Sequence, residues 1–492
     1  MFRNFVLKHQ KFFYRLLEIL PAFVSYNIIL FPYWGIFVMP NVVAYFVLTY
    51  NIYWFYQSLL IAVSAAVAHA RIRASQNFDW LGDLKSFPDW QKVRHIVIIP
   101  TYKEPLYILE RTFQALSRQT LPKSQLIPIL AMEASESEVE RKRKVRILKK
   151  KFGNFPVTVH TLSAGEIAGK ASNEKYAAIW AKESLIDAGL EMDYTVVTSC
   201  DADHIFHPNH FAALTFAFLD EPDRYKTFWQ PAVLLYNNVW EIPAVVRIMT
   251  TFGSIWNLSQ LARKDKLITT ANYSLSFRLL DAVGYWDADK IPEDWGIFFK
   301  AYYKSGGGIE VEPIYLPVYG NAAQSTSFWK TLKAQYQQMK RWAWGVSDDP
   351  WIIKNYLFTR GVPFWEKTMR LIHALQQHFL WPVNWFVITL GLQIPILINP
   401  RFGRTALGYT VPRLSSAILT VALVFLFMML FIDRIYKPPR PKNVPVWKGL
   451  IAPLEFLLMP IAGFFFSALP GLDAHTRLML GKYIQYKVTE KV

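Results

Sequence analysis

One apolar run constrains this chain more than any other feature: from Ile19 to Ala70 it contains no Asp, Glu, Lys or Arg. The run is too long for a single membrane helix, which needs about 20 apolar residues, and it fits two. Pro40 and Asn41 mark the expected turn between them. A cleavable signal peptide has an apolar core of only roughly 7–15 residues, so the run is not one. Residues 1–70 are therefore predicted to hold a pair of transmembrane helices.

Three further apolar stretches follow late in the sequence, at Ala374 to Pro400, Leu414 to Ile432 and Gly449 to Leu472. We expect the first two to span the membrane, which gives four full spans in all. The third is interrupted by prolines and is expected to be re-entrant or interfacial. Phe364 to Gln377 has the spacing of an amphipathic interfacial helix. Residues 364–492 thus form a membrane part, and residues 71–363 have the mixed composition of one large soluble domain.

The basic residues predict the orientation of the chain in the membrane. They flank the first two spans and follow the span that ends at Ile432: Arg3, Lys8, Lys11, Arg15, Arg71, Arg73, Arg434, Lys437, Arg440 and Lys442. These flanks are expected in the cytosol, which makes the chain a multi-pass protein of the cell membrane with a cytosolic domain. Arg401, Arg404 and Arg413 fall in the loop expected outside, against this pattern. The net charge of +17 fits a lipid surface rather than nucleic acid. A single cysteine, Cys200, suits a reducing compartment.

The soluble domain alternates strand-like and helix-like segments. The expected strands are His95–Pro100, Gln125–Met132, Val157–Thr161 and Tyr194–Ser199, and the expected helices are Leu106–Gln119, Glu136–Phe152 and Ala171–Leu185. Strands separated by helices of this length pair in parallel, with helices on both faces of the sheet. The predicted fold is therefore an α/β, Rossmann-like domain with a mostly parallel sheet. Ligands bind at the carboxyl ends of such strands, where polar and acidic residues follow in this sequence.

The last of these strands runs directly into "CDADH", residues 200–204. Asp201 and Asp203 would repel each other unless a positive charge lay between them. A pair of carboxylates on a turn can bind Mg²⁺ together with the phosphates of a substrate. The motif predicts a divalent cation that arrives with a diphosphate, although a single D-x-D is more often an ordinary turn.

Further short motifs occur in a fixed order along the chain. They are "IIPTYKEP" (98–105), "ILAMEAS" (129–135), "GKASNEKYA" (169–177), "CDADH" (200–204), "TANYSLSFR" (270–278), "PEDW" (292–295) and "QMKRW" (338–342). In this order they resemble the motifs of family 2 glycosyltransferases, and most of all the membrane-embedded branch with bacterial cellulose, hyaluronan and chitin synthases. The resemblance implies the GT-A fold, an Mg²⁺ or Mn²⁺ cofactor and a nucleotide-sugar donor, with UDP as the expected carrier.

The same resemblance implies roles in donor binding for residues at the strand ends. Thr101, Tyr102 and Glu104 would line the nucleotide pocket, as would Glu133, which stands where the family usually has an aspartate. Lys170 would lie near the uridine or the phosphates. Asp201 would bind the donor through the metal, with Asp203 and His204 as further metal ligands; a packed core histidine is an equal alternative for His204.

The two later motifs would supply the catalytic and acceptor-binding residues. In "PEDW", where the family usually has T-E-D, Asp294 would be the general base that takes the proton of the acceptor hydroxyl, and Glu293 would act beside it at the acceptor. In "QMKRW" the resemblance places Gln338 and Arg341 at the diphosphate and Trp342 against the acceptor sugar. Attack opposite the leaving group inverts the anomeric centre.

Three functions stay open at this point. The first is an inverting polysaccharide synthase that passes its product outward between the membrane helices, alone or with export or accessory subunits. The second is a non-processive transferase with a lipid acceptor, and the third is an inactive scaffold or transport partner. "YKVTEKV" (486–492) resembles the gating loop of cellulose synthases, with Tyr486, Thr489 and Lys491 as its members.

Overall fold

Seven strands form one mixed sheet in the computed structural model, which describes residue 6 and residues 8–485. The strands are β1 (Arg94–Thr101), β2 (Leu126–Glu133), β3 (Val157–His160), β4 (Thr195–Ser199), β5 (Thr227–Leu234), β6 (Ser274–Ser276) and β7 (Glu310–Tyr319). Their order across the sheet is β3-β2-β1-β4-β6-β5-β7. Only β6 runs antiparallel to its neighbours. The predicted α/β class with a mostly parallel sheet is confirmed.

The first four strands lie where the sequence predicts them. β1 is central and pairs in parallel with β2 on one side and β4 on the other. From His95 to Thr101 every residue of β1 is buried, as expected for a strand covered on both faces. The carboxyl ends of β1, β2 and β4 consequently meet at one edge of the sheet, and the acid-rich turn follows β4 directly.

Helices cover both faces of the sheet and give the domain two apolar cores. On one face Leu109, Phe113, Leu148 and Phe211 pack together; they belong to α5 (Leu106–Ser117), α6 (Glu138–Phe152) and α8 (His210–Asp220). The other face is covered by α7 (Lys170–Ala181), α10 (Phe277–Val283) and α11 (Asp294–Lys304). The remaining helices of the soluble part are α4 (Trp80–Leu84), α9 (Ala244–Gln260), α12 (Phe328–Ala343) and α13 (Asp349–Phe358).

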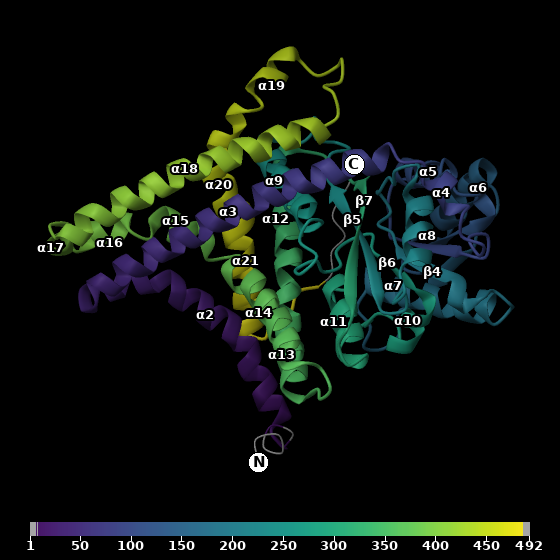
Figure 1. Cartoon of the computed structure of the whole chain (residues 1–492), viewed down its shortest axis with the longest axis horizontal. Helices are drawn as coiled ribbons and strands as arrows, with labels where there is room; N and C mark the ends of the chain where they lie inside the picture. The colour runs from purple at the N-terminus through teal and green to yellow at the C-terminus, as the bar shows by residue number, and fades with distance from the viewer. Residues whose placement is uncertain (1–5, 7, 486–492) are drawn as a thin grey trace.

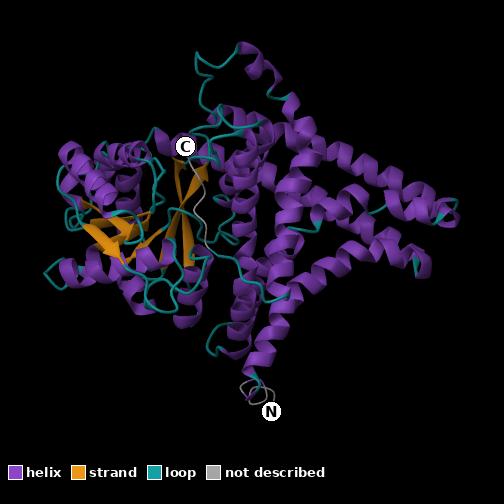
Figure 2. Ribbon diagram, turned by 180° about the vertical axis from the view of Figure 1, so that it is seen from behind, coloured by secondary structure: helices purple, strands orange, loops and turns teal. Residues whose placement is uncertain are grey.

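Long apolar helices extend away from the sheet toward one end of the molecule (Figures 1 and 2). Within the described residues four helical segments are long and apolar enough to cross a membrane: α2 (Gln10–Val38), α3 (Pro40–Gln76), α18 (Ala406–Tyr436) and the run Leu454–Met479. The predicted N-terminal pair corresponds to α2 and α3, with Met39 between them. Pro21 and Pro32 lie inside α2, which changes direction along its length (Figure 1) because proline removes a helical hydrogen bond.

The prediction of one continuous span from Ala374 to Pro400 is wrong. This stretch divides into the end of α14 (Phe364–Leu380), then α15 (Asn384–Leu390) and α16 (Gln393–Ile398), with α17 (Pro400–Gly403) after it. Pro382 falls in the first break, where a residue without an N–H cannot continue the hydrogen-bond ladder. The predicted interfacial helix at 364–377 corresponds to α14.

The proline-containing segment at the C-terminal end forms a longer helical run than expected. After α19 (Val446–Ile451), a 3₁₀ turn at Leu454–Leu458, α20 (Met459–Gly463), a π turn at Phe464–Ala468 and α21 (Leu469–Met479) follow one another without a gap. The 3₁₀ and π turns accommodate the prolines. The run is long enough to cross a membrane, but it lies crosswise to α3 and α18 (Figures 1 and 2). That direction fits the predicted interfacial position, which stays a prediction.

Candidate functional site

A cavity of about 1540 Å³ opens at the carboxyl ends of the parallel strands. All the predicted site residues within the described part of the chain line it: Thr101, Tyr102, Glu104, Glu133, Lys170, Asp201, Asp203, His204, Glu293, Asp294, Gln338, Arg341 and Trp342. They come from six separate stretches of sequence, and the sheet and its covering helices bring them to one place. Tyr486, Thr489 and Lys491 lie outside the described residues.

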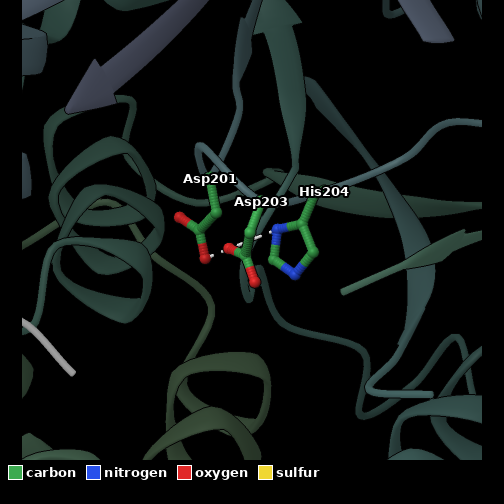
Figure 3. Close-up of side chains that lie close together, drawn as sticks. All are labelled: Asp201, Asp203 and His204. Atoms are coloured by element: carbon green, nitrogen blue, oxygen red, sulfur yellow. Dashed lines mark ion pairs between the residues drawn. The ribbon is translucent and has the colours of Figure 1, made fainter. Parts of the chain in front are cut away.

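The turn at residues 201–204, called the acid turn below, follows β4 and lines this cavity. Asp201, Asp203 and His204 each offer one ligand atom, and these atoms lie within 4.8 Å of one another. Figure 3 shows the three side chains turned toward a common centre. Asp203 and His204 are buried, whereas Asp201 is partly exposed. Two carboxylates and an imidazole at this separation suit Mg²⁺ or Mn²⁺, which bind oxygen and nitrogen ligands.

Asn272 positions this turn through both ends of its amide. Its Oδ1 accepts the backbone N–H of Asp201 at 3.1 Å, and its Nδ2 donates to His204 Nδ1 at 2.8 Å. The backbone of Asn272 has φ 65°, a left-handed conformation that asparagine tolerates better than most residues. Because Nδ1 of His204 is used in this way, the two carboxylates are the better-placed metal ligands. Asn272 belongs to the motif "TANYSLSFR", but the D-x-D spacing gives no sign that it supports the acid turn.

A second backbone contact fixes the buried carboxylate. The N–H of Asn321, just beyond β7, donates to Asp203 Oδ2 at 2.9 Å. Gly320 precedes it, and a Cβ at that position would lie 2.2 Å from His204 Nε2. Only glycine therefore lets the chain pass so close to the histidine ring.

Lys170, at the first position of α7, supplies positive charge to the site. Its Nζ lies 2.8 Å from Asp201 Oδ1 and 2.9 Å from Glu293 Oε1, so one ammonium joins the acid turn to the "PEDW" motif. Burial opposes this charge, but the carboxylates of Asp201, Glu293 and Glu174 outweigh burial and hold the pKa of Lys170 well above its ordinary value. Burial raises the pKa of Glu174 to about 8. At neutral pH the ammonium is therefore shared mainly between Asp201 and Glu293.

Asp294 begins α11 at the edge of the cavity. Its Oδ1 accepts the N–H of Trp295 at 2.8 Å, and its backbone carbonyl accepts a hydrogen bond from Thr269 Oγ1 at 2.6 Å. Burial, followed by the charge of Glu293, raises the pKa of Asp294 to about 7. A carboxylate of this basicity can take up a proton near neutral pH far better than an ordinary aspartate.

The strand ends carry further carboxyl groups in fixed positions. Thr101 Oγ1 donates to Glu104 Oε2 at 2.6 Å, and the N–H of Tyr102 donates to the same carboxylate. Glu133, at the end of β2, accepts the hydroxyl of Ser135. These contacts hold the ends of β1 and β2 in defined conformations beside the acid turn.

One face of α12 presents Gln338, Arg341 and Trp342 to the cavity, as the spacing i, i+3, i+4 on a helix requires. Gln338 is buried, while Trp342 is 41% exposed and so can offer a ring face. Lys340, which points away from this face, pairs with Asp473 of α21 at 3.0 Å. The helix thereby links the site to the C-terminal segment.

The cavity continues from the acid turn to the long apolar helices. Its lining there comes from α3, α15 and the run 454–479: Tyr53, Trp54, Gln57, Ser58, Asn384, Trp385, Thr389, Pro460, Gly463 and Ser467. Several of these side chains carry amides or hydroxyls. Polar groups are costly in membrane-spanning segments, and where they occur they commonly line a substrate path.

Part of the chain is similar in sequence to a known protein family. Residues 196–432 match the family described as Glycosyl transferase family group 2, a range that holds the acid turn, Asp294 and the face of α12. Over these residues the chain is therefore similar to family 2 glycosyltransferases. No curated protein shows significant sequence similarity to it.

Solved structures resemble the chain at low sequence identity. The mannosyltransferase PcManGT from Pyrobaculum calidifontis, in complex with GDP-Man and Mn²⁺, is 14% identical, with 86% of this chain and 100% of that chain covered and a TM-score of 0.44. S. aureus TarS 1-349 in complex with UDP-GlcNAc is 13% identical, with 80% and 94% covered and a TM-score of 0.36. GalNAc-T7 with UDP, GalNAc and Mn²⁺ is 14% identical, with 61% and 57% covered and a TM-score of 0.32.

Proposed function

We propose, from the similarity of residues 196–432 to family 2 glycosyltransferases, that this chain is an inverting, metal-dependent glycosyltransferase that extends a polysaccharide from a nucleotide sugar. One observation supports this above all: the acid turn, Asp294 and the Arg341 face of α12 share a single cavity with polar residues of the apolar helices. Donor, acceptor and passage for the product are thus all accommodated in one continuous space.

In this proposal the donor binds at the strand ends. Thr101, Tyr102, Glu104 and Glu133 surround the nucleoside, and the carboxylates of Asp201 and Asp203, with His204 beside them, would hold a divalent cation. Mg²⁺ or Mn²⁺ held there would supply positive charge to offset the charge of the departing diphosphate. Arg341 and Lys170 can add hydrogen bonds to the same phosphates, with Gln338 beside them.

Asp294 acts on the acceptor. Its carboxylate takes the proton of an acceptor hydroxyl while that oxygen bonds to the anomeric carbon and the bond from this carbon to the diphosphate breaks. The products are the extended acceptor and a nucleoside diphosphate, and the proton passes from Asp294 to solvent. Glu293 and Trp342 hold the acceptor sugar, since an aromatic face packs well against a sugar ring.

Polar side chains in the inner part of the cavity support a glycan acceptor over a lipid tail in this proposal. The lining near the apolar helices combines tryptophan rings with amide and hydroxyl groups, including Gln57, Asn384 and Thr389. Such groups hydrogen-bond sugar hydroxyls, whereas a hydrocarbon tail would leave them unpaired. We propose accordingly that the chain is a multi-pass membrane protein, with the sheet domain in the cytosol and the product leaving between α3, α15 and the run 454–479.

Sugar transfer by the purified full-length protein tests the function. A panel of UDP- and GDP-sugars is incubated with it in detergent and Mn²⁺, and both nucleoside diphosphate release and product size are measured. We expect polymer from one donor, its loss in Asp294→Asn, and full activity in Asp289→Asn, which changes an exposed acid outside the cavity. A lipid bearing one sugar would establish the lipid-acceptor alternative. Equal nucleotide release by wild type and Asp294→Asn would refute the role of the base, and no release from any donor would favour a scaffold.

A further inference from the structure

A buried histidine on α14 lines the cavity at the level of the catalytic base. His378 is 8% exposed, and its Nδ1 lies 2.6 Å from Asp349 Oδ1. Asp349, on α13, is completely buried. No sequence motif pointed to either residue.

The hydrogen bond to Asp349 determines what the other ring nitrogen can do. A carboxylate accepts only, so Nδ1 must carry a proton and Nε2 is left as the variable nitrogen. Nε2 makes no hydrogen bond to the described residues, and His378 is among the residues that line the cavity. This nitrogen can therefore accept a hydrogen bond from a hydroxyl in the cavity when it is neutral, or donate one when it is charged.

Two residues that contact His378 are close in sequence to the proposed active-site residues Asp294 and Arg341. The ring of Trp295, next in sequence to Asp294, packs against His378 with ring centroids 5.0 Å apart. Gly345, four residues after Arg341, lies close to the Nε2 edge, where a Cβ would be 3.1 Å away. His378 lines the same cavity as Asp294, and its sequence neighbours Gln377 and Trp381 line it too.

We propose that His378 binds the acceptor: Nε2 hydrogen-bonds a hydroxyl of the terminal acceptor sugar, and Asp349 fixes the ring for that contact. This inference rests on the proposed glycosyltransferase function. In this arrangement Asp294, Trp342 and His378 hold one sugar from three elements, α11, α12 and α14. Asp349 is a positioning residue, since it acts only through the imidazole.

A purely structural role is the alternative: the hydrogen bond between His378 and Asp349 would only stabilise the packing of α13 against α14. His378→Asn distinguishes the two roles, because its amide can keep the hydrogen bond to Asp349 while the nitrogen at the position of Nε2 is lost. His378→Gln is the conservative variant, since its amide reaches toward the position of Nε2. His373→Asn is the matched control: His373 also packs on Trp295, at 6.4 Å, but does not line the large cavity.

Steady-state kinetics of the full-length protein with glucose-, N-acetylglucosamine- and mannose-based disaccharides as acceptors provides the test. We expect His378→Asn to raise the acceptor KM about tenfold, the effect of one lost hydrogen bond, with the donor KM and acceptor-free nucleotide release unchanged. His378→Gln should recover part of the loss, and His373→Asn should match wild type.

The results separate failure of this inference from failure of the function itself. An unchanged acceptor KM in His378→Asn, or equal effects in His373→Asn, would overturn the role of His378 while sugar transfer stands. A wild-type protein that transfers no sugar to any acceptor would overturn the proposed function.

Discussion

Asn272 contacts two parts of the acid turn with a single side chain, and no local sequence rule reveals it. The amide orientation is fixed because Oδ1 faces a backbone N–H, which can only donate. Nδ2 must then face His204. The acid turn itself was predictable from D-x-D spacing, but its support comes from a residue about 70 positions away in the sequence.

Replacing Asn272 should weaken the metal site. Asn272→Gly keeps the left-handed backbone and removes both hydrogen bonds, so we expect about 10- to 100-fold weaker Mn²⁺ binding, measured by electron paramagnetic resonance. Asn272→Ala should show the same loss and also unfold more easily, by about 1–3 kcal/mol, because alanine is strained at φ 65°. Wild-type Mn²⁺ affinity in Asn272→Gly would show that the amide does not organise the site.

The raised pKa of Asp294 predicts how activity depends on pH. A general base must be unprotonated, and the pKa is about 7, so kcat/KM should rise with pH and level off above about 7. Below that value it should fall tenfold per pH unit. In Asp294→Asn activity should drop about 10²–10⁴-fold and lose this dependence. A wild-type profile that is flat from pH 5 to 8 would contradict the assignment.

At the scale of elements, sequence patterns identified β1 to β4 but not β5 to β7. Pro231 interrupts β5 and coincides with a register shift against β7. β7 contains Pro313 and Pro317 and can accommodate them because it is an edge strand. β6 has only three residues, too few for any periodicity. Prolines also explain the wrong assignment at residues 374–400. The apolar composition of this stretch suggested one membrane span, but the chain forms short helices there, with Pro382 in the first break.

An ion pair between two largely buried side chains joins the soluble domain to the run 454–479. Arg247 of α9 contacts both carboxylate oxygens of Glu455, at 2.7 and 3.0 Å, and donates to the carbonyl of Val239 at 2.6 Å. This is the kind of long-range contact that fixes one element against another and that composition cannot predict.

Removing one member of that pair should destabilise the protein strongly. We expect Arg247→Ala to cost about 3 kcal/mol, because the largely buried carboxylate of Glu455 is left without its partner. The double variant Arg247→Met, Glu455→Leu should recover most of this. Thermal unfolding in detergent compares them, and a single variant as stable as the double would show that the pair contributes nothing.

For the whole molecule, the continuous cavity connects the candidate active site with the apolar helices that we propose to span the membrane. The basic flanks predict that the sheet domain and the loop near Arg404 lie on opposite sides. The structure places the loop at the tip of the apolar helices, far from the sheet (Figure 1). The single natural cysteine, Cys200, is buried, which provides a clean background for labelling.

Single introduced cysteines test this orientation in intact cells. Arg404→Cys and Ser124→Cys both change exposed positions. A membrane-impermeant maleimide should label the first in intact cells and the second only after permeabilisation. Labelling of Ser124→Cys in intact cells would reverse the proposed topology, and unchanged Cys200 serves as the control.

Sugar transfer as a function of metal concentration tests whether the acid turn works by holding a divalent cation. We expect no transfer in chelator, recovery with added Mn²⁺ or Mg²⁺, and a loss of at least about 100-fold in Asp203→Asn at any metal concentration. Undiminished transfer in chelator, or by Asp203→Asn, would contradict it.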